Sequence, residues 1–271
     1  MSTATGTRPG AVTDSATMLR RNLRHMQRYP SLTLLTAALP IVFLLIFVYV
    51  FGGTLGAGLH HGPAAGRAAY LAYVAPGILV FTVASAAQST AISVAMDMTT
   101  GIIDRFRTMA IARAAVLTGH VFSSMIQSAL SVALVLGVAV LIGFRPDAGP
   151  LGGLAAAGML AAAAFAFTWL TVALGLAART VESASNTPMF LIVLPFLGSG
   201  FVPAGSMPAG LRWFAEYQPF TPITETVRGL LTGGPVAAHA MAAGAWCAGI
   251  ALVSYLWARW RYRTARGPAA A

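Results

Sequence analysis

Almost the whole chain consists of long apolar segments separated by short polar ones. This pattern is compatible with one kind of fold. About 20 apolar residues in a helix cross the hydrocarbon core of a bilayer, and in lipid the backbone must satisfy its own hydrogen bonds. The sequence therefore predicts an all-α integral membrane protein whose transmembrane domain covers residues 31–260. Six transmembrane helices are expected, at about residues 32–51, 71–96, 119–142, 151–177, 188–202 and 241–257.

Composition agrees with a membrane protein and excludes several other classes. The 271 residues are 57% hydrophobic and only 9% charged, whereas a soluble domain is about 25% charged. The net charge of +10 does not predict a nucleic-acid partner, because the basic residues, all arginines, lie at the ends of apolar segments rather than in one patch. The single cysteine, Cys247, excludes a disulfide framework. We predict no metal site, since the adjacent His60 and His61 have no third candidate ligand nearby.

The residues before the first apolar segment fall into two parts. Residues 1–13 are rich in Thr, Gly, Ala and Pro and are predicted to be disordered. Residues 14–30 can form a helix with one apolar face, which predicts an amphipathic helix in the membrane interface with its arginines toward anionic lipid headgroups. Those arginines are Arg20, Arg21, Arg24 and Arg28. Charge that only orients the first span would explain the arginines but not the apolar face.

The distribution of the arginines predicts the orientation in the membrane. With six spans, thirteen of the 17 arginines lie on the side that holds both termini and the connection between the second and third spans. Arginine is enriched in cytoplasmic loops, so both termini and the segment Asp97–His120 are expected in the cytoplasm, with residues 261–271 as a cytoplasmic tail. The polar segment between the fifth and sixth spans then faces outward.

The segment Asp97–His120 is the one sizeable charged surface apart from the termini. Its charged side chains are Asp97, Asp104, Arg105, Arg107 and Arg113. A protein outside the membrane could bind the chain there. The simpler alternative is that these side chains only keep a loop hydrated.

Two sets of side chains inside the spans have regular helical spacing. Ser85 and Ser89 share a face of the second span, and the third span carries a similar polar face. Small and polar faces are typical of membrane helices that pack closely, so the two spans are expected to pack together, and a substrate path is the alternative. Phe43 and Phe47, followed by Phe51, form an aromatic stripe for which packing, lipid contact and a substrate path all remain open.

Residues 201–239 are too polar to span the membrane and too apolar for a free loop. An amphipathic stretch begins at Pro208, in which Arg212 and Glu216 form an i,i+4 pair. Thr221 is predicted to cap a second short helix that runs through Leu231. We expect the two short helices to form a hairpin that dips into the outer membrane interface.

Two of these segments resemble the type-2 ATP-binding-cassette exporter permeases, and in particular their daunorubicin-resistance branch. The first is the run Gly101, Ile102, Ile103, Asp104, Arg105, Phe106 and Arg107, which continues to Arg113. The second comprises Ser199, Gly200, Pro203, Met207, Pro208, Gln218, Pro219, Phe220, Thr221, Pro222 and Arg228. Departures from the family pattern are Asp97 for glutamate, Ala110 for proline and Gln218 for asparagine.

The resemblance implies a permease subunit in the bacterial plasma membrane that works with a separate cytoplasmic ATPase, which binds ATP and Mg²⁺. The chain has no lysine and therefore no phosphate-binding Gly-x-x-x-x-Gly-Lys motif. It also implies that Asp97–Arg113 forms the coupling loop that contacts the ATPase and that two permease chains, identical or homologous, pair within the lipid. The substrate would be a hydrophobic or amphiphilic compound.

Alternatives from other classes are separable by simple observations. A membrane enzyme would turn over a lipid without partners, but the histidines are scattered away from the acidic residues. An ATPase-independent carrier would transport alone, and the lack of prominent ionisable residues inside the spans argues against it. A lipid or polysaccharide exporter of the same superfamily is a third alternative, because fold does not determine substrate.

Overall fold

A computed structural model describes residues 30–59, 66–99, 113–178 and 180–264, and these residues form helices and turns. Five helical segments in this part of the chain are long and apolar enough to cross a membrane. Four of them are single helices, α4 (Arg67–Thr99), α6 (Arg113–Leu141), α7 (Pro150–Ala177) and α12 (Ala237–Thr264). The first is composite, because α2 (Pro30–Ile46) continues through the π-helical turn η1 (Phe47–Phe51) into α3 (Gly52–Leu59). The protein is therefore a helical membrane protein.

The fifth apolar segment differs from the predicted span at 188–202. It is a shorter helical run, Val181–Leu197, made of α8 (Val181–Asn186), η2 (Thr187–Met189), α9 (Phe190–Val193) and η3 (Leu194–Leu197). Thr180 starts the run early, because its side chain accepts a hydrogen bond from the Ser183 amide in a capping box. Pro188 and Pro195 lack the amide that a continuous helix needs, so the run is broken into short turns.

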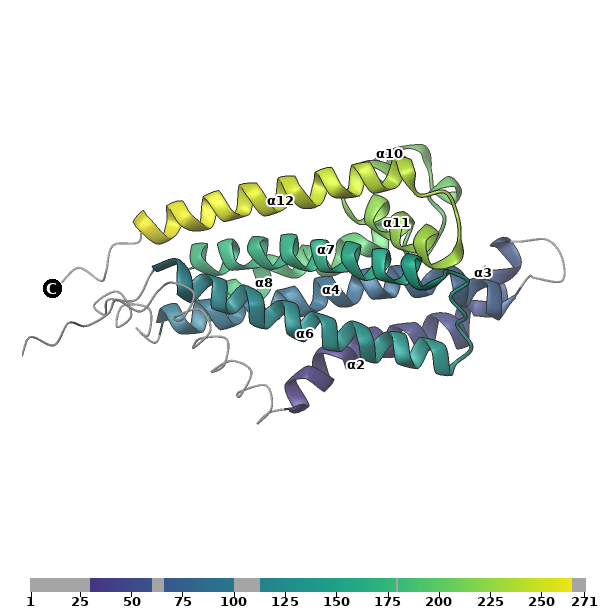
Figure 1. Cartoon of the computed structure of the whole chain (residues 1–271), viewed down its shortest axis with the longest axis horizontal. Helices are drawn as coiled ribbons and strands as arrows, with labels where there is room; N and C mark the ends of the chain where they lie inside the picture. The colour runs from purple at the N-terminus through teal and green to yellow at the C-terminus, as the bar shows by residue number, and fades with distance from the viewer. Residues whose placement is uncertain (1–29, 60–65, 100–112, 179, 265–271) are drawn as a thin grey trace, which may run out of the picture.

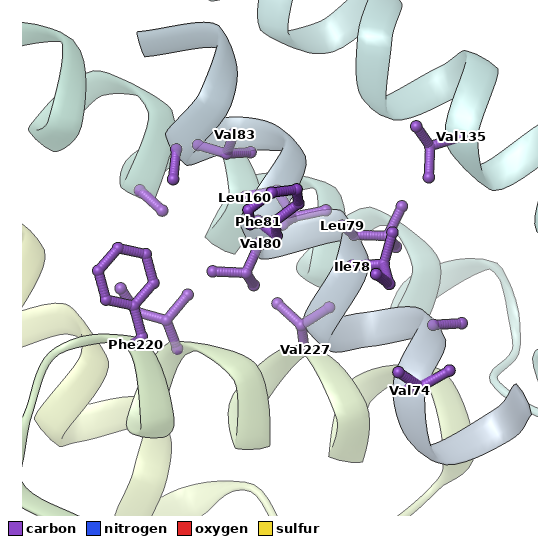
Figure 2. Packing of buried hydrophobic residues seen from close by; sticks show 14 of the residues in the cluster. Val74, Ile78, Leu79, Val80, Phe81, Val83, Val135, Leu160, Phe220 and Val227 are labelled. Atoms are coloured by element: carbon purple, nitrogen blue, oxygen red, sulfur yellow. The ribbon is translucent and has the colours of Figure 1, made fainter. Parts of the chain in front are cut away.

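Helix α4 occupies the centre of the bundle. In its most apolar stretch 78% of the residues are buried, compared with 17% in α12 and 22% in the α2–α3 segment. Helices α2, α6, α7 and α11 (Phe220–Thr232) all pack against it. Figure 2 shows Val227 of α11 directed toward the α4 side chains around Ile78 and Val80. The exposed faces of α2, α6 and α12 are apolar and suit lipid.

Polar side chains join α4, α6 and α7 inside the bundle. The Thr90 hydroxyl of α4 donates to Ser124 Oγ of α6 at 2.7 Å, and Ser124 lies 3.2 Å from the Thr168 hydroxyl of α7. All three side chains are buried. The prediction that the second and third spans pack together is therefore confirmed. The predicted contact face of the second span is wrong, because Thr90 makes the bond to α6, whereas Ser85 and Ser89 lie beside Thr36 of α2 and Ile192 of α9.

The aromatic stripe of the first span lies against the broken segment. The Phe43 ring centroid is 5.3 Å from that of Phe196 and 5.4 Å from that of Phe81. Phe47 lies 4.8 Å from Phe201, which stacks on Phe196 at 4.5 Å. Phe43 and Phe47 thus hold α2 and η1 to α4 and to the short helices.

The helices arrange the chain into two ends, which Figure 1 shows along the horizontal axis. The carboxyl end of α4, the start of α6 and the carboxyl end of α12 lie together at one end. Helix α3 and the short helices α10 (Ala209–Tyr217) and α11 lie at the other. The end that carries Thr99, Arg113 and Thr264 is called the loop end below, and the opposite one the hairpin end.

Candidate functional sites at the two ends of the bundle

At the loop end, an acidic and a basic side chain join α4 to α6. Asp97 Oδ2 lies 3.0 Å from His120 Nε2, and the two side chains are only 18% and 9% exposed. The pair fixes the last turn of α4 beside the start of α6, on either side of the predicted coupling loop.

The remaining residues predicted for the coupling loop and the interface helix fall largely outside the described part of the chain. This applies to Gly101, Ile102, Asp104, Arg105 and Arg107 of the coupling loop, and to Arg20, Arg21, Arg24 and Arg28 of the interface helix. Arg113 is described as the first residue of α6. The roles assigned to these residues remain predictions.

At the hairpin end, α10 and α11 form two short consecutive helices. Pro208 and Pro219 are the residues that precede their first turns. The expectation that Thr221 caps the second helix is wrong, because α11 already begins at Phe220 and Thr221 lies inside its first turn. The Thr221 hydroxyl instead accepts a hydrogen bond from the Ser199 amide at 3.1 Å. Thr221 therefore ties α11 to the turn that follows the broken segment.

Arg228 of α11 makes the densest set of polar contacts at this end. Its guanidinium donates to the Tyr73 carbonyl at 3.1 Å, to the Ser199 carbonyl at 2.9 Å and to the Glu225 carboxylate. It also lies over the Tyr73 ring, 3.8 Å from the centroid. Because the Arg228 side chain is only 11% exposed, these contacts replace most of its water. We call Tyr73, Ser199, Glu225 and Arg228 the Arg228 cluster.

The local sequence of α4 prepares this end for the cluster. Pro76 lies inside α4 and has no amide to donate to the carbonyl one turn back, which weakens the helix ladder beside Tyr73. The Tyr73 hydroxyl donates to the Ser199 carbonyl at 2.7 Å, and the Tyr70 hydroxyl donates to Phe201 O at 3.0 Å. Both tyrosines therefore bind the turn that joins the broken segment to the hairpin.

Glycines let the backbones of α4 and this turn touch. A Cβ placed on Gly77 would lie 2.3 Å from the carbonyl oxygen of Gly200, well inside any real contact. In addition, Gln218 Nε2 donates to the Leu194 carbonyl at 3.1 Å, which holds the end of α10 against the broken segment. The turn is thus enclosed by α4 on one side and the hairpin on the other.

The structure brings together most of the second motif that the sequence singled out. Ser199, Gly200, Gln218, Thr221 and Arg228 converge on one turn, and Pro222 is buried in the first turn of α11. Pro203 lies on the wall of an adjacent open cavity of about 510 Å³, which also touches Tyr217, Glu225, Arg228 and His239. The residues of this motif therefore hold α4, the turn and α11 together at the hairpin end.

Comparison with known proteins identifies the family. The family described as ABC-2 type transporter matches residues 14–232, which include the predicted coupling loop, the Arg228 cluster and both helices of the hairpin. The chain belongs to this family. The ABC-2 membrane domain is a permease that contains no ATPase domain.

Curated relatives of this ABC-2 permease are named as drug-resistance proteins. The "Daunorubicin resistance ABC transporter permease protein DrrB1" of Streptomyces coeruleorubidus is 29% identical over 251 residues, which cover 91% of this chain and 83% of that protein. The "Probable doxorubicin resistance ABC transporter permease protein DrrC" of two Mycobacterium tuberculosis strains, CDC 1551 / Oshkosh and H37Rv, is 25% identical over 217 residues. These cover 79% of this chain and 75% of that protein.

Within this permease, a second hollow lies among the long helices. It is a groove of about 240 Å³ between α2, α4 and α9, lined by Thr36, Leu39, Ser85, Gln88, Ser89, Ile92 and Ile192. The predicted residues Ser85 and Ser89 both lie on its wall. Phe43 and Phe47 do not, since they belong to the aromatic contacts with Phe196 and Phe201. We call this hollow the serine groove.

Several residues that shape these sites gave no distinct signal in the sequence. Tyr73 and Gly77 are two of many apolar residues in α4, and Gln88 is a lone amide in an apolar run. His120 carries no motif that would pair it with Asp97 across 23 residues. Their roles depend on contacts between helices, which a single sequence without related sequences does not reveal.

Proposed function

We propose that this chain is the membrane subunit of an exporter that moves a hydrophobic or amphiphilic compound out across the bacterial plasma membrane. The observation that carries the proposal is the family match over residues 14–232, together with a relative aligned over 91% of the chain whose name records daunorubicin resistance. A separate ATPase subunit binds and hydrolyses ATP with Mg²⁺. A second permease copy, or a homologue, completes the path.

The proposed topology has six spans, with both termini in the cytoplasm. The five long helices and the shorter run Val181–Leu197 are the six membrane segments. Residues 14–30 lie along the inner interface, and the α10–α11 hairpin faces outward. The carboxyl ends of α4 and α12 and the start of α6 lie at one end of the bundle, which supports this topology, because the arginine-rich tail and the ends of the coupling loop then share one side.

In the proposed mechanism, movement of the ATPase is transmitted through the coupling loop to α4 and α6. The Asp97–His120 contact makes the adjoining ends of these helices respond together. Helix α4 also packs on α2, α7 and α11, so a displacement at the loop end shifts the bundle as a packed unit. The Arg228 cluster joins α4 to the hairpin, which brings the motion to the outer end.

The first experiment tests ATP-driven export. The tagged chain is purified from its native membranes in mild detergent, and the ATPase that accompanies it is identified and reconstituted with it in liposomes. We expect doxorubicin, followed by its fluorescence, to move in the export direction only when ATP and Mg²⁺ are present. Transport by the chain alone would instead support an ATPase-independent carrier. ATP-driven movement of a lipid or polysaccharide in place of doxorubicin would indicate the other exporter branch.

A triple substitution tests the coupling loop. Replacement of Asp104, Arg105 and Arg107 by alanine is expected to weaken ATPase binding by roughly tenfold or more, because each charge-assisted hydrogen bond contributes about 1.5–3 kcal/mol. The measurement is ATPase retained per permease after affinity purification, with ATP-driven transport in parallel.

A matched set of charges at the hairpin end provides the control. Arg145, Asp147 and Arg212 also comprise one aspartate and two arginines, and all three are exposed. Their replacement by alanine is expected to leave ATPase binding unchanged. If the loop variant still retained the ATPase at the wild-type level, the contact would have to lie elsewhere on the chain.

A further inference from the structure

The serine groove combines hydrogen-bonding and apolar walls at the depth of the membrane. Thr36, Ser85, Gln88 and Ser89 supply polar groups, and Leu39, Ile92 and Ile192 supply apolar surface. Its α4 residues lie in the half of that helix toward Asp97, which is the inner half of the membrane in the proposed topology. Leu39 is 44% exposed, so the groove opens on the lipid-facing surface of the bundle.

The polar side chains of the groove are held in place, and one of them has unused hydrogen-bonding capacity. Gln88 Nε2 donates to the Ser185 carbonyl at 3.1 Å, and Gln127 Nε2 donates to Thr36 Oγ1 at 3.1 Å. Ser89 donates to Ala86 O at 2.8 Å. Ser85 Oγ, by contrast, is buried and has no hydrogen-bond partner among the described residues.

An unpaired buried hydroxyl in an apolar helix is costly, and helical serines usually avoid the cost by bonding a carbonyl of the preceding turn. Thr82 of the same helix does so with the Ile78 carbonyl at 2.7 Å. Ser85 leaves this local bond unmade, as Ser123, Ser128 and Ser131 of α6 also do, but of these four serines only Ser85 lines the groove. Because Ser85 Oγ is shielded in this conformation, a polar group that enters the groove would supply the missing partner after the Ser85 hydroxyl rotates toward it.

The charge of the groove restricts what that group can be. None of its lining residues is charged, so an ammonium or phosphate buried there would lose water without gaining a counter-charge. A hydroxyl, ether or carbonyl group would lose far less. The apolar wall and the opening toward lipid suit an attached hydrocarbon.

We propose that the serine groove binds an amphiphile through an uncharged hydrogen-bonding group, with Ser85 as its partner and Gln88 and Thr36 beside it. This inference rests on the proposed export function and adds a substrate class to it: compounds that enter from the inner leaflet with a neutral polar group foremost. A resident membrane lipid with a neutral headgroup has the same chemistry.

Photolabelling of the purified full chain in lipid nanodiscs tests the proposal. The probes are an alkyl glucoside that carries a diazirine on its chain and a trimethylammonium amphiphile with the same chain. We expect the glucoside to label peptides that contain the groove residues of α4, and the cationic probe to label them at least about threefold less. Equal labelling by both probes, or labelling spread evenly over the exposed faces of α6 and α12, would overturn the proposal.

Two serines of α4 provide a matched pair of variants. Ser85→Ala is expected to raise the half-saturating glucoside concentration about three- to tenfold, the effect of one lost hydrogen bond. Ser93→Ala makes the same substitution at an exposed position whose hydroxyl donates to the Ser89 carbonyl and which does not line the groove, and no change is expected. Equal effects of the two variants would count against the site.

Separate results identify the source of the ligand and test the proposed export function. A neutral lipid that is retained by the wild type and lost from Ser85→Ala identifies a lipid as the occupant. ATP-driven transport of the glucoside by the full complex, with a raised KM in Ser85→Ala, identifies an exported compound. If doxorubicin export works without groove labelling, this inference fails while the proposed function stands. Groove labelling without ATP-driven export would support the binding site and contradict the export function.

Discussion

Replacement of Gly77 by leucine is expected to abolish recovery of the folded protein. A Cβ at this position would lie 2.3 Å from the Gly200 carbonyl oxygen and 2.8 Å from the Gly200 Cα. Both are backbone atoms, so no rotamer change relieves the overlap, and α4 must move away from the turn. Overpacking of a core typically costs about 1–3 kcal/mol even where side chains can adjust, and here the Arg228 cluster and the tyrosine hydrogen bonds would separate as well.

Gly137 of α6 is the matched control for this substitution. It also lies in a long apolar helix, but it is exposed and a Cβ there would meet nothing within 4 Å. Gly137→Leu is expected to behave like the wild type in size-exclusion chromatography and in thermal unfolding in detergent. Gly77→Ala should lie between wild type and Gly77→Leu. If Gly77→Leu were recovered with an unchanged melting temperature, the contact between α4 and the turn would not exist as described.

Hydropathy was sufficient to predict the long helices, because an apolar run of span length has few alternatives. The structure places α4, α6, α7 and α12 close to four of the predicted segments. The first segment extends beyond its predicted end into α3, whose four glycines do not favour a helix by themselves. Packing against α4 supports this extension.

The broken segment shows where such reasoning stops. The early start at Thr180 depends on a capping hydrogen bond to Ser183, which hydropathy does not register. Thr221 is an error of the same kind. Its sequence suits a helix cap, but its hydroxyl binds the Ser199 amide, 22 residues away.

The composition of the candidate site was only partly accessible from the sequence. Arg228 belongs to the second motif that the sequence singled out, and the i,i+3 spacing of Glu225 and Arg228 suits a contact on one helix. The contacts of Arg228 with Tyr73, across 155 residues, have no such local signal. Packing of α11 on α4 creates them, and no local pattern encodes which tyrosine of α4 lies beneath the arginine.

Loss of the Arg228 side chain is expected to cost about 3–5 kcal/mol of stability, the usual effect of breaking a largely buried ion pair by removal of one partner. In Arg228→Ala the Glu225 carboxylate would lose its counter-charge, and the guanidinium donors to the Tyr73 and Ser199 carbonyls would be lost. We expect a clear fall in melting temperature in detergent and poor recovery of the folded protein. Arg228→Lys should remain destabilised, because a lysine ammonium cannot reproduce the planar fork of donors.

The other ion pair of the hairpin separates the effect of burial from that of charge. Arg212 and Glu216 form an i,i+4 pair at 2.7 Å, but their side chains are 53% and 43% exposed. Arg212→Ala removes the same charge from the same hairpin and is expected to cost less than about 1 kcal/mol. Each variant removes one arginine from the hairpin and leaves the rest of α10 and α11 unchanged. A large loss of stability in Arg228→Ala alone would therefore be due to the contacts of Arg228 with α4 and the turn. Equal losses in the two variants would mean that Arg228 acts only as a surface charge, and the Arg228 cluster would then not hold the hairpin to the bundle.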